Sequence, residues 1–295
     1  KLICIYYYMA QQIIITSKQL HTISGLLKEE DNLSPNIRAY SFDWDDNIIN
    51  MPTTIKMLKK TDNGWDKIEV GTSEFATLRD NENYDLDEGA FDNFISEESF
   101  LNDLQIGLNN NSFAPSFNKF KEALIYANPI SIITARGHDP KVLRKGMDLV
   151  ISHTFNEDEL SKMIDNIQQQ IPELEGETPE IILKTYLDSH DYHTVTSDIF
   201  AEKFGLESGS AVNPEENKKV ALRDYVSKIV TKAKEMVNTD YNKLSVGFSD
   251  DDLGNVNAIV PFIEEVLQVE FPEVDFVVYD TSEGGMNKIV LKQVD

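Results

Sequence analysis

The sequence predicts an α/β protein with a Rossmann-like, doubly wound parallel sheet. Three short apolar runs support this prediction: 39–42, 129–133 and 244–248. Polar residues bound each run, and a short continuous apolar run is typical of a strand buried on both faces. Asp43 and Thr134 follow the first two runs directly, and Asp250 follows the third after Ser249. Because ligands bind beyond the carboxyl ends of parallel strands, these three places predict a single site.

Composition narrows the possible partners. The chain has 295 residues, 41% of them hydrophobic, with 27 Lys+Arg against 51 Asp+Glu, a net charge of −24. This charge disfavours nucleic acid as a partner, because phosphate binding needs clustered Lys and Arg. No run of about 20 apolar residues predicts a membrane span. The single cysteine, Cys4, allows no internal disulfide, and we expect a cytoplasmic location. The oligomeric state is left open.

We expect residues 1–36 to be an N-terminal extension and a helix. The apolar residues at 2–8 end in Tyr8, where a signal peptide needs a small residue, and Met9 is a plausible start. Thr16 and Gln19 have the spacing of a capping box, which predicts a helix to about Lys28.

Residues 51–111 are expected to form an inserted unit with its own small structure. The stretches 55–60 and 65–70 flank Asn63-Gly64, which predicts a hairpin turn. An acidic and aromatic stretch follows, up to a polar run at 109–111. A predicted helix at about 115–126 then leads into the second strand.

Residues 138–214 are expected to form a second, mostly helical insertion, with short strands near Val150 and Val195. Pro214 is expected to open a long helix to about Val237. Another helix is predicted at about 255–269, followed by strands at 274–279 and 288–291. The predicted core thus comprises residues 37–50, 112–137 and 215–295.

The polar residues at the strand ends suggest phosphoryl transfer through a carboxylate. Asp43 can attack phosphorus, and Asp45 can protonate the leaving oxygen and later activate water. Two carboxylates repel a phosphate dianion, so a cation is required. Asp250 and Asp251 supply the hard oxygen ligands that Mg²⁺ prefers. Thr134 and a lysine would contact the phosphoryl oxygens.

These motifs occur in a known order. Residues 42–48 (Phe-Asp-Trp-Asp-Asp-Asn-Ile) resemble the first motif, DxDx(T/V), of haloacid dehalogenase-like hydrolases. Residues 132–134 resemble the second motif, Lys218 the third, and the acidic run at 248–255 the fourth. Asn47 and Ser249 depart from the family pattern, and Lys219 is an alternative to Lys218.

The resemblance implies a Mg²⁺-dependent phosphomonoester hydrolase that forms an aspartyl-phosphate on a small phosphorylated substrate. The 51–111 insertion stands where the family places a cap. The implied roles are catalytic for Asp43 and Asp45, phosphate-binding for Thr134 and Lys218, and metal-binding for Asp43, Asp45, Asp250 and Asp251.

Two other functions stay open: a non-catalytic binding or assembly protein with this fold, and a nucleic-acid end phosphatase, which the net charge disfavours. An EF-hand loop starting at Asp43 is excluded, because Ile48 and Thr54 stand where Gly and Glu are needed. A phospho-receiver is excluded because its acidic pair precedes the nucleophile.

Two further sequence features involve histidine. His190 and His193 are interpreted as surface histidines rather than half of a metal site. The run Arg136-Gly137-His138 follows Thr134 and is a candidate for substrate contact, although a turn after the strand explains Gly137 equally well.

Overall fold

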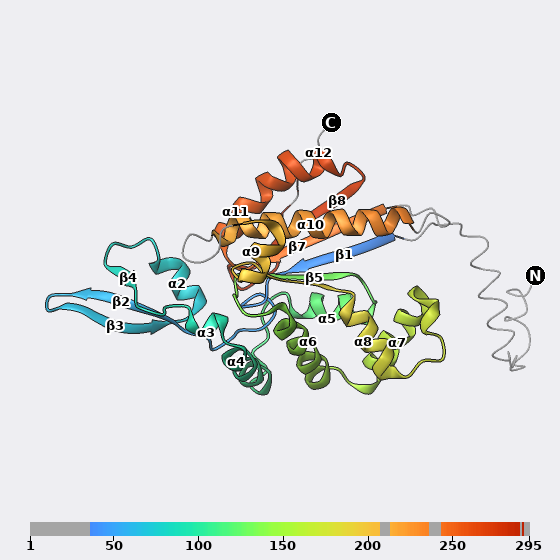
Figure 1. Ribbon diagram of the computed structural model, residues 1–295, viewed down its shortest axis with the longest axis horizontal. Coiled ribbons are helices and arrows are strands. Elements are labelled where there is room, and N and C mark those ends of the chain that lie inside the picture. The colour runs from blue at the N-terminus through green and yellow to red at the C-terminus, as the bar shows by residue number, and fades with distance from the viewer. Residues whose placement is uncertain (1–35, 207–212, 236–242, 290, 292–295) are drawn as a thin grey trace, which may run out of the picture.

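A computed structural model describes residues 36–206, 213–235, 243–289 and 291 (Figure 1). The predicted extension at 1–8 and the predicted helix at 16–28 lie outside these residues. Within them the chain is an α/β fold, with a six-stranded sheet between two layers of helices. No helix of these residues is long and apolar enough to cross a membrane.

The central sheet has the strand order β6-β5-β1-β7-β8-β9. Its strands are β1 (Asn36–Phe42), β5 (Ile130–Thr134), β6 (Asp191–Thr194), β7 (Lys243–Asp250), β8 (Val274–Asp280) and β9 (Asn287–Ile289). All neighbours pair in parallel except β8 and β9, which are antiparallel. The chain moves outward from β1 through β5 to β6, then returns to β7 on the other side of β1. This reversal makes the carboxyl ends of β1 and β7 the expected ligand-binding crevice.

Helices cover both faces of the sheet (Figure 1). One layer contains α4 (Glu97–Asn109), α5 (Phe117–Ile125), α6 (Pro140–Thr154), α7 (Glu157–Gln170) and α8 (Pro179–Asp188), with the short 3₁₀ turn η2 (Pro172–Leu174). The other contains α9 (Asp198–Phe204), α10 (Pro214–Glu235) and α11 (Leu253–Phe262), which continues through the π-helical η3 (Ile263–Leu267) into α12 (Gln268–Glu270). Each layer packs its own apolar cluster on the sheet, which is the doubly wound arrangement that the sequence predicted.

The 51–111 segment forms a second sheet beside the first. Strands β2 (Ile55–Thr61), β3 (Gly64–Val70) and β4 (Tyr84–Leu86) are antiparallel in the order β3-β2-β4. The predicted hairpin is confirmed: Thr61 pairs with Gly64 across a two-residue turn, and Gly64 has a φ of 124° that favours glycine. The short helices α2 (Thr72–Leu78) and α3 (Asp92–Ile95) complete a small apolar core.

Both ends of the 51–111 segment are attached to the main core. Its last helix, α4, buries Phe100, Leu104 and Leu108 completely in the cluster under the main sheet. The two ends of the segment also meet, because the Asn50 N–H donates to the Ser112 carbonyl at 2.8 Å. The 51–111 segment therefore has its own sheet and core but shares one helix with the Rossmann-like part.

Two expectations for residues 138–214 are wrong. Val150 lies in α6 and not in a strand, because Leu143, Met147 and Val150 recur at helical spacing and bury one face of that helix. The segment is also not separate from the core sheet, since it supplies β6, which pairs in parallel with β5. Residues 138–214 therefore include the helical crossover from β5 to β6, a strand and its following helix α9.

Candidate functional site

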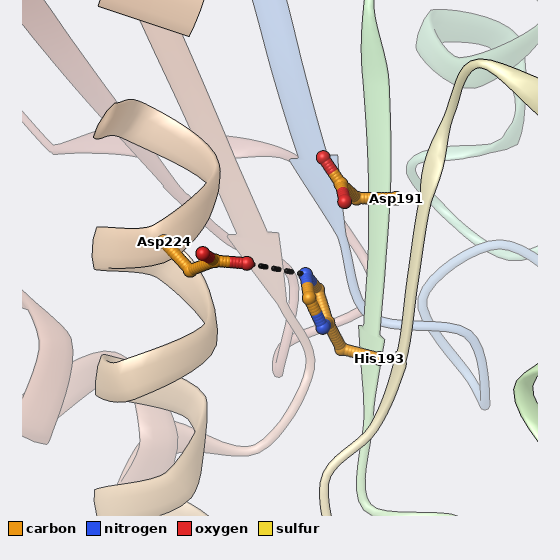
Figure 2. Close-up of side chains that lie close together, drawn as sticks. All are labelled: Asp191, His193 and Asp224. Atoms are coloured by element: carbon orange, nitrogen blue, oxygen red, sulfur yellow. Dashed lines mark ion pairs between the residues drawn. The ribbon is translucent and has the colours of Figure 1, made fainter. Parts of the chain in front are cut away.

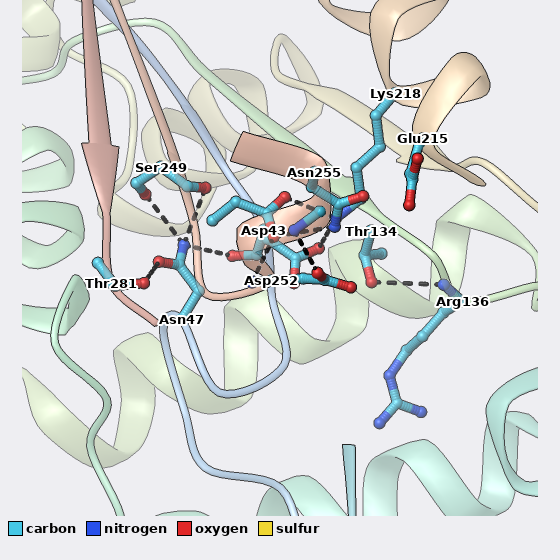
Figure 3. A network of polar contacts seen from close by, with 12 residues as sticks. Asp43, Asn47, Thr134, Arg136, Glu215, Lys218, Ser249, Asp252, Asn255 and Thr281 are labelled. Carbon is cyan, nitrogen blue, oxygen red and sulfur yellow. Dashed lines mark hydrogen bonds and ion pairs between the residues drawn. The ribbon is translucent and has the colours of Figure 1, made fainter. Parts of the chain in front are cut away.

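The ends of β1 and β7 bring four predicted site residues together (Figure 3). Asp43 follows β1, and its N–H donates to the Ser249 carbonyl on β7 at 3.0 Å. Asp250 ends β7. Lys218, in the first turns of α10, donates to Asp43 Oδ1 at 3.1 Å and to Asp250 Oδ2 at 2.7 Å. Asp251 is the next residue, and we call Asp43, Asp250 and Asp251 with Lys218 the carboxylate cluster.

Burial determines the electrostatics of the carboxylate cluster. Asp43, Asp250 and Lys218 are at most 6% exposed. Burial raises the pKa of Asp43 to about 8 even though Lys218 lowers it. Burial, with Asp43 and Asp250 adding to it, raises the pKa of Asp251 to about 10. Burial alone would lower the pKa of Lys218, but Asp250 and Asp43 raise it above its ordinary value. With all three carboxylates ionised, the site would carry more negative charge than its lysine balances, so a proton or a cation must offset the excess.

The carboxylate cluster fits a divalent cation. Oxygen atoms of Asp43, Asp250 and Asp251 lie within 4.8 Å of one another. Among the described residues, the Asp251 carboxylate has no hydrogen-bond or ion-pair partner. Three carboxylates and one lysine leave a formal charge of −2, and hard oxygen ligands of this kind are those that Mg²⁺ prefers. A partly buried carboxylate without a partner is costly unless a cation or water binds it.

The three consecutive acidic residues after β7 have different environments. The second oxygen of Asp250 accepts hydrogen bonds from the Asp252 N–H and from Asn255 Nδ2, both at 3.0 Å. Asp252 caps α11 by accepting from the Gly254 N–H at 2.7 Å. It also pairs with Arg79 of the 51–111 segment at 3.1 Å. The first residue thus joins the cluster, the second is unpartnered and the third caps a helix.

The structure also places the predicted phosphate-binding residues. Thr134 ends β5 and is 1% exposed, and its hydroxyl accepts from the Arg136 N–H at 3.4 Å. Figure 3 shows Thr134 and Lys218 on the same side of Asp43. Lys219, the alternative to Lys218, instead pairs with Glu216 on the same helix at 2.6 Å. Lys218 is therefore the lysine that the fold brings to the strand ends.

Asp45 lies outside the carboxylate cluster. Its two oxygens accept from Arg136 Nε at 2.9 Å and Arg136 Nη2 at 2.6 Å. Arg136 is fully buried, and its Nη2 also donates to Thr53 Oγ1 at 2.7 Å. The Arg136 side chain leads away from Lys218 (Figure 3). Arg136 was expected to contact substrate; here it binds the predicted acid–base residue.

Asn47 joins the strand ends around Asp43 through a fully buried network (Figure 3). Its amide nitrogen donates to the Asp43 carbonyl at 3.1 Å and to Ser249 Oγ at 3.0 Å. Its oxygen accepts from Ser116 Oγ and from Thr281 Oγ1, both at 2.9 Å. Sequence reasoning noted Asn47 and Ser249 only as departures from a motif. Their common network was missed because nothing in a linear sequence connects positions 202 residues apart.

A second charged cluster lies on β6, α9 and α10. It comprises Asp191, His193 and Asp224, with Lys203 and Lys228, and we call it the histidine cluster (Figure 2). His193 Nε2 faces Asp224 at 3.9 Å, which is too long for a hydrogen bond. Asp224 pairs with Lys228 at 2.9 Å and with Lys203 at 3.0 Å, and Lys228 also pairs with Asp191. Two lysines thus balance two carboxylates, so this cluster needs no metal ion for charge compensation.

The interpretation of His190 and His193 as surface residues is wrong. They are 8% and 3% exposed. Burial lowers the pKa of His190 to about 3 and that of His193 to about 4. The burial of these histidines could not be recognised from the sequence, because β6 is short, its residues are mostly polar, and helices cover it.

No family model, curated protein or solved structure matches this chain. The residues and their geometry therefore carry the functional argument.

Proposed function

We propose that this chain is a Mg²⁺-dependent phosphomonoester hydrolase of the haloacid dehalogenase-like type, with Asp43 as its nucleophile. One observation carries the proposal: Lys218 joins Asp43 to Asp250 at the switch point of the sheet, beside the unpartnered Asp251. A buried nucleophilic carboxylate with a fixed cation and two further carboxylates is what phosphoryl transfer to an aspartate requires.

Asp43, Asp250 and Asp251 would hold the metal ion. When bound, Mg²⁺ offsets the charge of the phosphate dianion against the surrounding carboxylates. Of the four predicted metal ligands, Asp45 is the one that lies outside the carboxylate cluster, and both of its oxygens accept hydrogen bonds from Arg136.

The reaction has two steps. The Asp43 carboxylate attacks phosphorus, the bond between phosphorus and the leaving oxygen breaks, and Asp45 gives that oxygen a proton. Asp45 then takes a proton from water, which attacks the aspartyl-phosphate and releases inorganic phosphate. Lys218 and the Thr134 hydroxyl donate to the phosphoryl oxygens. Each Asp45 oxygen accepts one hydrogen bond from Arg136 and keeps a second lone pair, through which it can exchange the proton.

The 51–111 segment is proposed to act as the cap over this site, with a small phosphorylated molecule as substrate. Arg79 at the end of α2 supports this role, because it pairs with Asp252 at 3.1 Å and with Glu215 at 3.8 Å. These acidic residues flank the carboxylate cluster in sequence. The segment is therefore attached beside the strand ends as well as through α4.

The test separates the two carboxylates of the first motif. Asp43→Asn should eliminate turnover of p-nitrophenyl phosphate with Mg²⁺, because an amide cannot form the acyl phosphate. Asp45→Asn should lose about 10²–10⁴-fold in steady-state rate but still release a burst of p-nitrophenolate and accumulate phosphoenzyme. Lys219→Met is the control and should keep the wild-type rate. Equal behaviour of the two aspartate variants would contradict the proposed roles.

One observation favours a second candidate, a metal-binding protein of this fold without turnover. Both oxygens of Asp45, the proposed acid–base residue, are held in a buried ion pair with Arg136. Mg²⁺ binding at Asp251 without hydrolysis of nucleotides, sugar phosphates or phosphopeptides would support this candidate instead.

A further inference from the structure

Besides Asp45, the guanidinium of Arg136 contacts three residues of the 51–111 segment, Thr53, Phe94 and Phe100, while its buried Nη1 has no hydrogen-bond partner among the described residues. Its Nη2 donates to Thr53 Oγ1 at 2.7 Å, and the Thr53 hydroxyl donates onward to Asp103 Oδ2 on α4 at 2.6 Å. Thr53 is 2% exposed. These bonds form a continuous polar relay from Asp45 through Arg136 and Thr53 to Asp103.

Two aromatic rings contact the guanidinium of Arg136. Arg136 Cζ lies 4.9 Å from the ring centre of Phe94 on α3 and 4.9 Å from that of Phe100 on α4. A desolvated guanidinium against an aromatic face is attracted by about 2 kcal/mol. Both rings belong to the 51–111 segment, so the segment fixes the plane of the guanidinium as well as one of its hydrogen bonds.

The backbone beside Arg136 is in direct contact with the same segment. The Gly137 N–H donates to the Phe94 carbonyl at 3.1 Å. A Cβ at Gly137 would lie 2.8 Å from Ile95 Cγ2, so α3 lies directly on this loop. A displacement of α3 or α4 would therefore change the environment of Arg136 at once.

The two hydrogen bonds that the Arg136 guanidinium donates to Asp45 in turn fix the orientation of the Asp45 carboxylate. A bidentate pair defines the plane of the carboxylate as well as its distance. Breaking a buried pair of this kind leaves an uncompensated charge, so Asp45 keeps its orientation as long as Arg136 keeps its own.

We infer that Arg136 is a positioning residue that makes the orientation of the Asp45 carboxylate depend on the docking of the 51–111 segment. This inference rests on the proposed function, in which Asp45 is the acid–base group. It assigns the segment a part in the proton transfers, in addition to covering the site. Thr53 is the point at which the coupling can be cut without removing a charge or an aromatic ring from the core.

The alternative is that Arg136 has only a structural role. In that case its substitution would lower the stability of the protein, and it would lower the rate by the same factor on all substrates. A positioning residue for the acid–base group predicts a loss that grows with the basicity of the leaving group, because a more basic leaving oxygen needs the proton more. Phenyl phosphate and p-nitrophenyl phosphate provide this contrast with nearly the same shape.

The experiment compares Thr53→Val, Thr53→Ser and Thr54→Val in the full chain with Mg²⁺. Valine keeps the shape of Thr53 and removes the hydroxyl, whereas serine keeps the hydroxyl. Thr54 is the matched control, since its hydroxyl contacts Glu69 at an exposed site of the same segment. We expect Thr53→Val to lower kcat on phenyl phosphate about tenfold more than on p-nitrophenyl phosphate, a fraction of the full acid–base contribution. The two control variants should keep the wild-type ratio.

Arg136→Lys is the second variant, because it keeps the charge and removes the fork. It should change the ratio more than Thr53→Val while the Mg²⁺-induced rise in melting temperature stays. An unchanged ratio in both variants, with active wild-type protein, would overturn the positioning role alone. Wild-type protein without turnover on either substrate would overturn the proposed function itself, and the inference with it.

Discussion

Helix α10 contributes residues to both the carboxylate cluster and the histidine cluster, and the two clusters differ in how far lysines balance their acidic charge. Lys218 and Asp224 lie on the same helix, six residues apart. The carboxylate cluster is buried at the strand ends and has a formal charge of −2. The histidine cluster lies nearer the surface, where two lysines bring its charge to zero. The proposed metal site is thus distinguished from the histidine cluster by the burial of acidic groups that no lysine balances.

The largest expected difference between the two clusters concerns their lysines. Lys218→Met should lower the free energy of unfolding by about 3–5 kcal/mol without Mg²⁺, because it leaves buried carboxylates uncompensated. Lys228→Met should cost less than about 1 kcal/mol, since Lys228 is 39% exposed and its ion pairs are screened. Urea unfolding of both variants measures the contrast. Similar losses in the two would mean that the clusters do not differ in the way described.

The next effect is the response to Mg²⁺. At a concentration 100 times its dissociation constant, a ligand that binds only the folded state adds about 2.7 kcal/mol to the free energy of unfolding. Melting curves should therefore shift upward with Mg²⁺ in wild-type protein and in Asp224→Asn. Asp251→Asn should reduce the shift. A shift that is lost in Asp224→Asn and kept in Asp251→Asn would place the metal in the histidine cluster.

The smallest effect concerns acid stability and His193. Its pKa is about 4 in the folded protein because it is buried, against about 6.5 in the unfolded chain. Between these two values the unfolded state binds the extra proton, so stability is lost as the pH falls from about 6.5 toward 4. From pH 7 to 5.5, wild-type protein should lose about 1 kcal/mol more than His193→Gln. Chemical denaturation of both proteins at the two pH values measures this difference. Equal losses of unfolding free energy in wild-type protein and His193→Gln would show that His193 does not titrate in this way.

The sequence predicted the parallel sheet because its strands are short and apolar on both faces, as 129–133 shows. It predicted the hairpin at 55–70 because Asn63-Gly64 is a strong local turn signal. It also predicted a short strand near Val195, and β6 ends directly before that residue at Thr194. The strand predicted near Val150 is wrong, because the apolar residues there bury one face of the helix α6. Local patterns thus identified the strands of the sheet, and failed where a buried helix face resembles a short apolar strand.

The residues of the candidate site likewise divide into those that sequence signals predicted and those that only the fold brings together. Asp43 and Asp250 were predicted because each occurs where a strand ends, and Lys218 because of the resemblance to the third motif; the fold places Lys218 within hydrogen-bonding distance of both aspartates. The partners of Asp45 were not foreseen. Arg136 lies 91 positions from Asp45, and its contact with Thr53 depends on how the 51–111 segment docks. Tertiary packing alone creates that pair.

Asn47 has a consequence for how related sequences should vary. Its amide uses both of its donors and its oxygen on partners from three other segments, among them Ser116, Ser249 and Thr281. A valine at position 47 would remove the Asn47 partner of these buried hydroxyls; Ser116 and Ser249 would keep their mutual hydrogen bond at 3.2 Å, whereas Thr281 would lose its partner at a cost of about 1–3 kcal/mol. The two departures from the motif, Asn47 and Ser249, are therefore one change and not two. Homologous chains should inherit or lose the four residues together, so that their covariation would mark a lineage in which this substitution has become difficult to reverse.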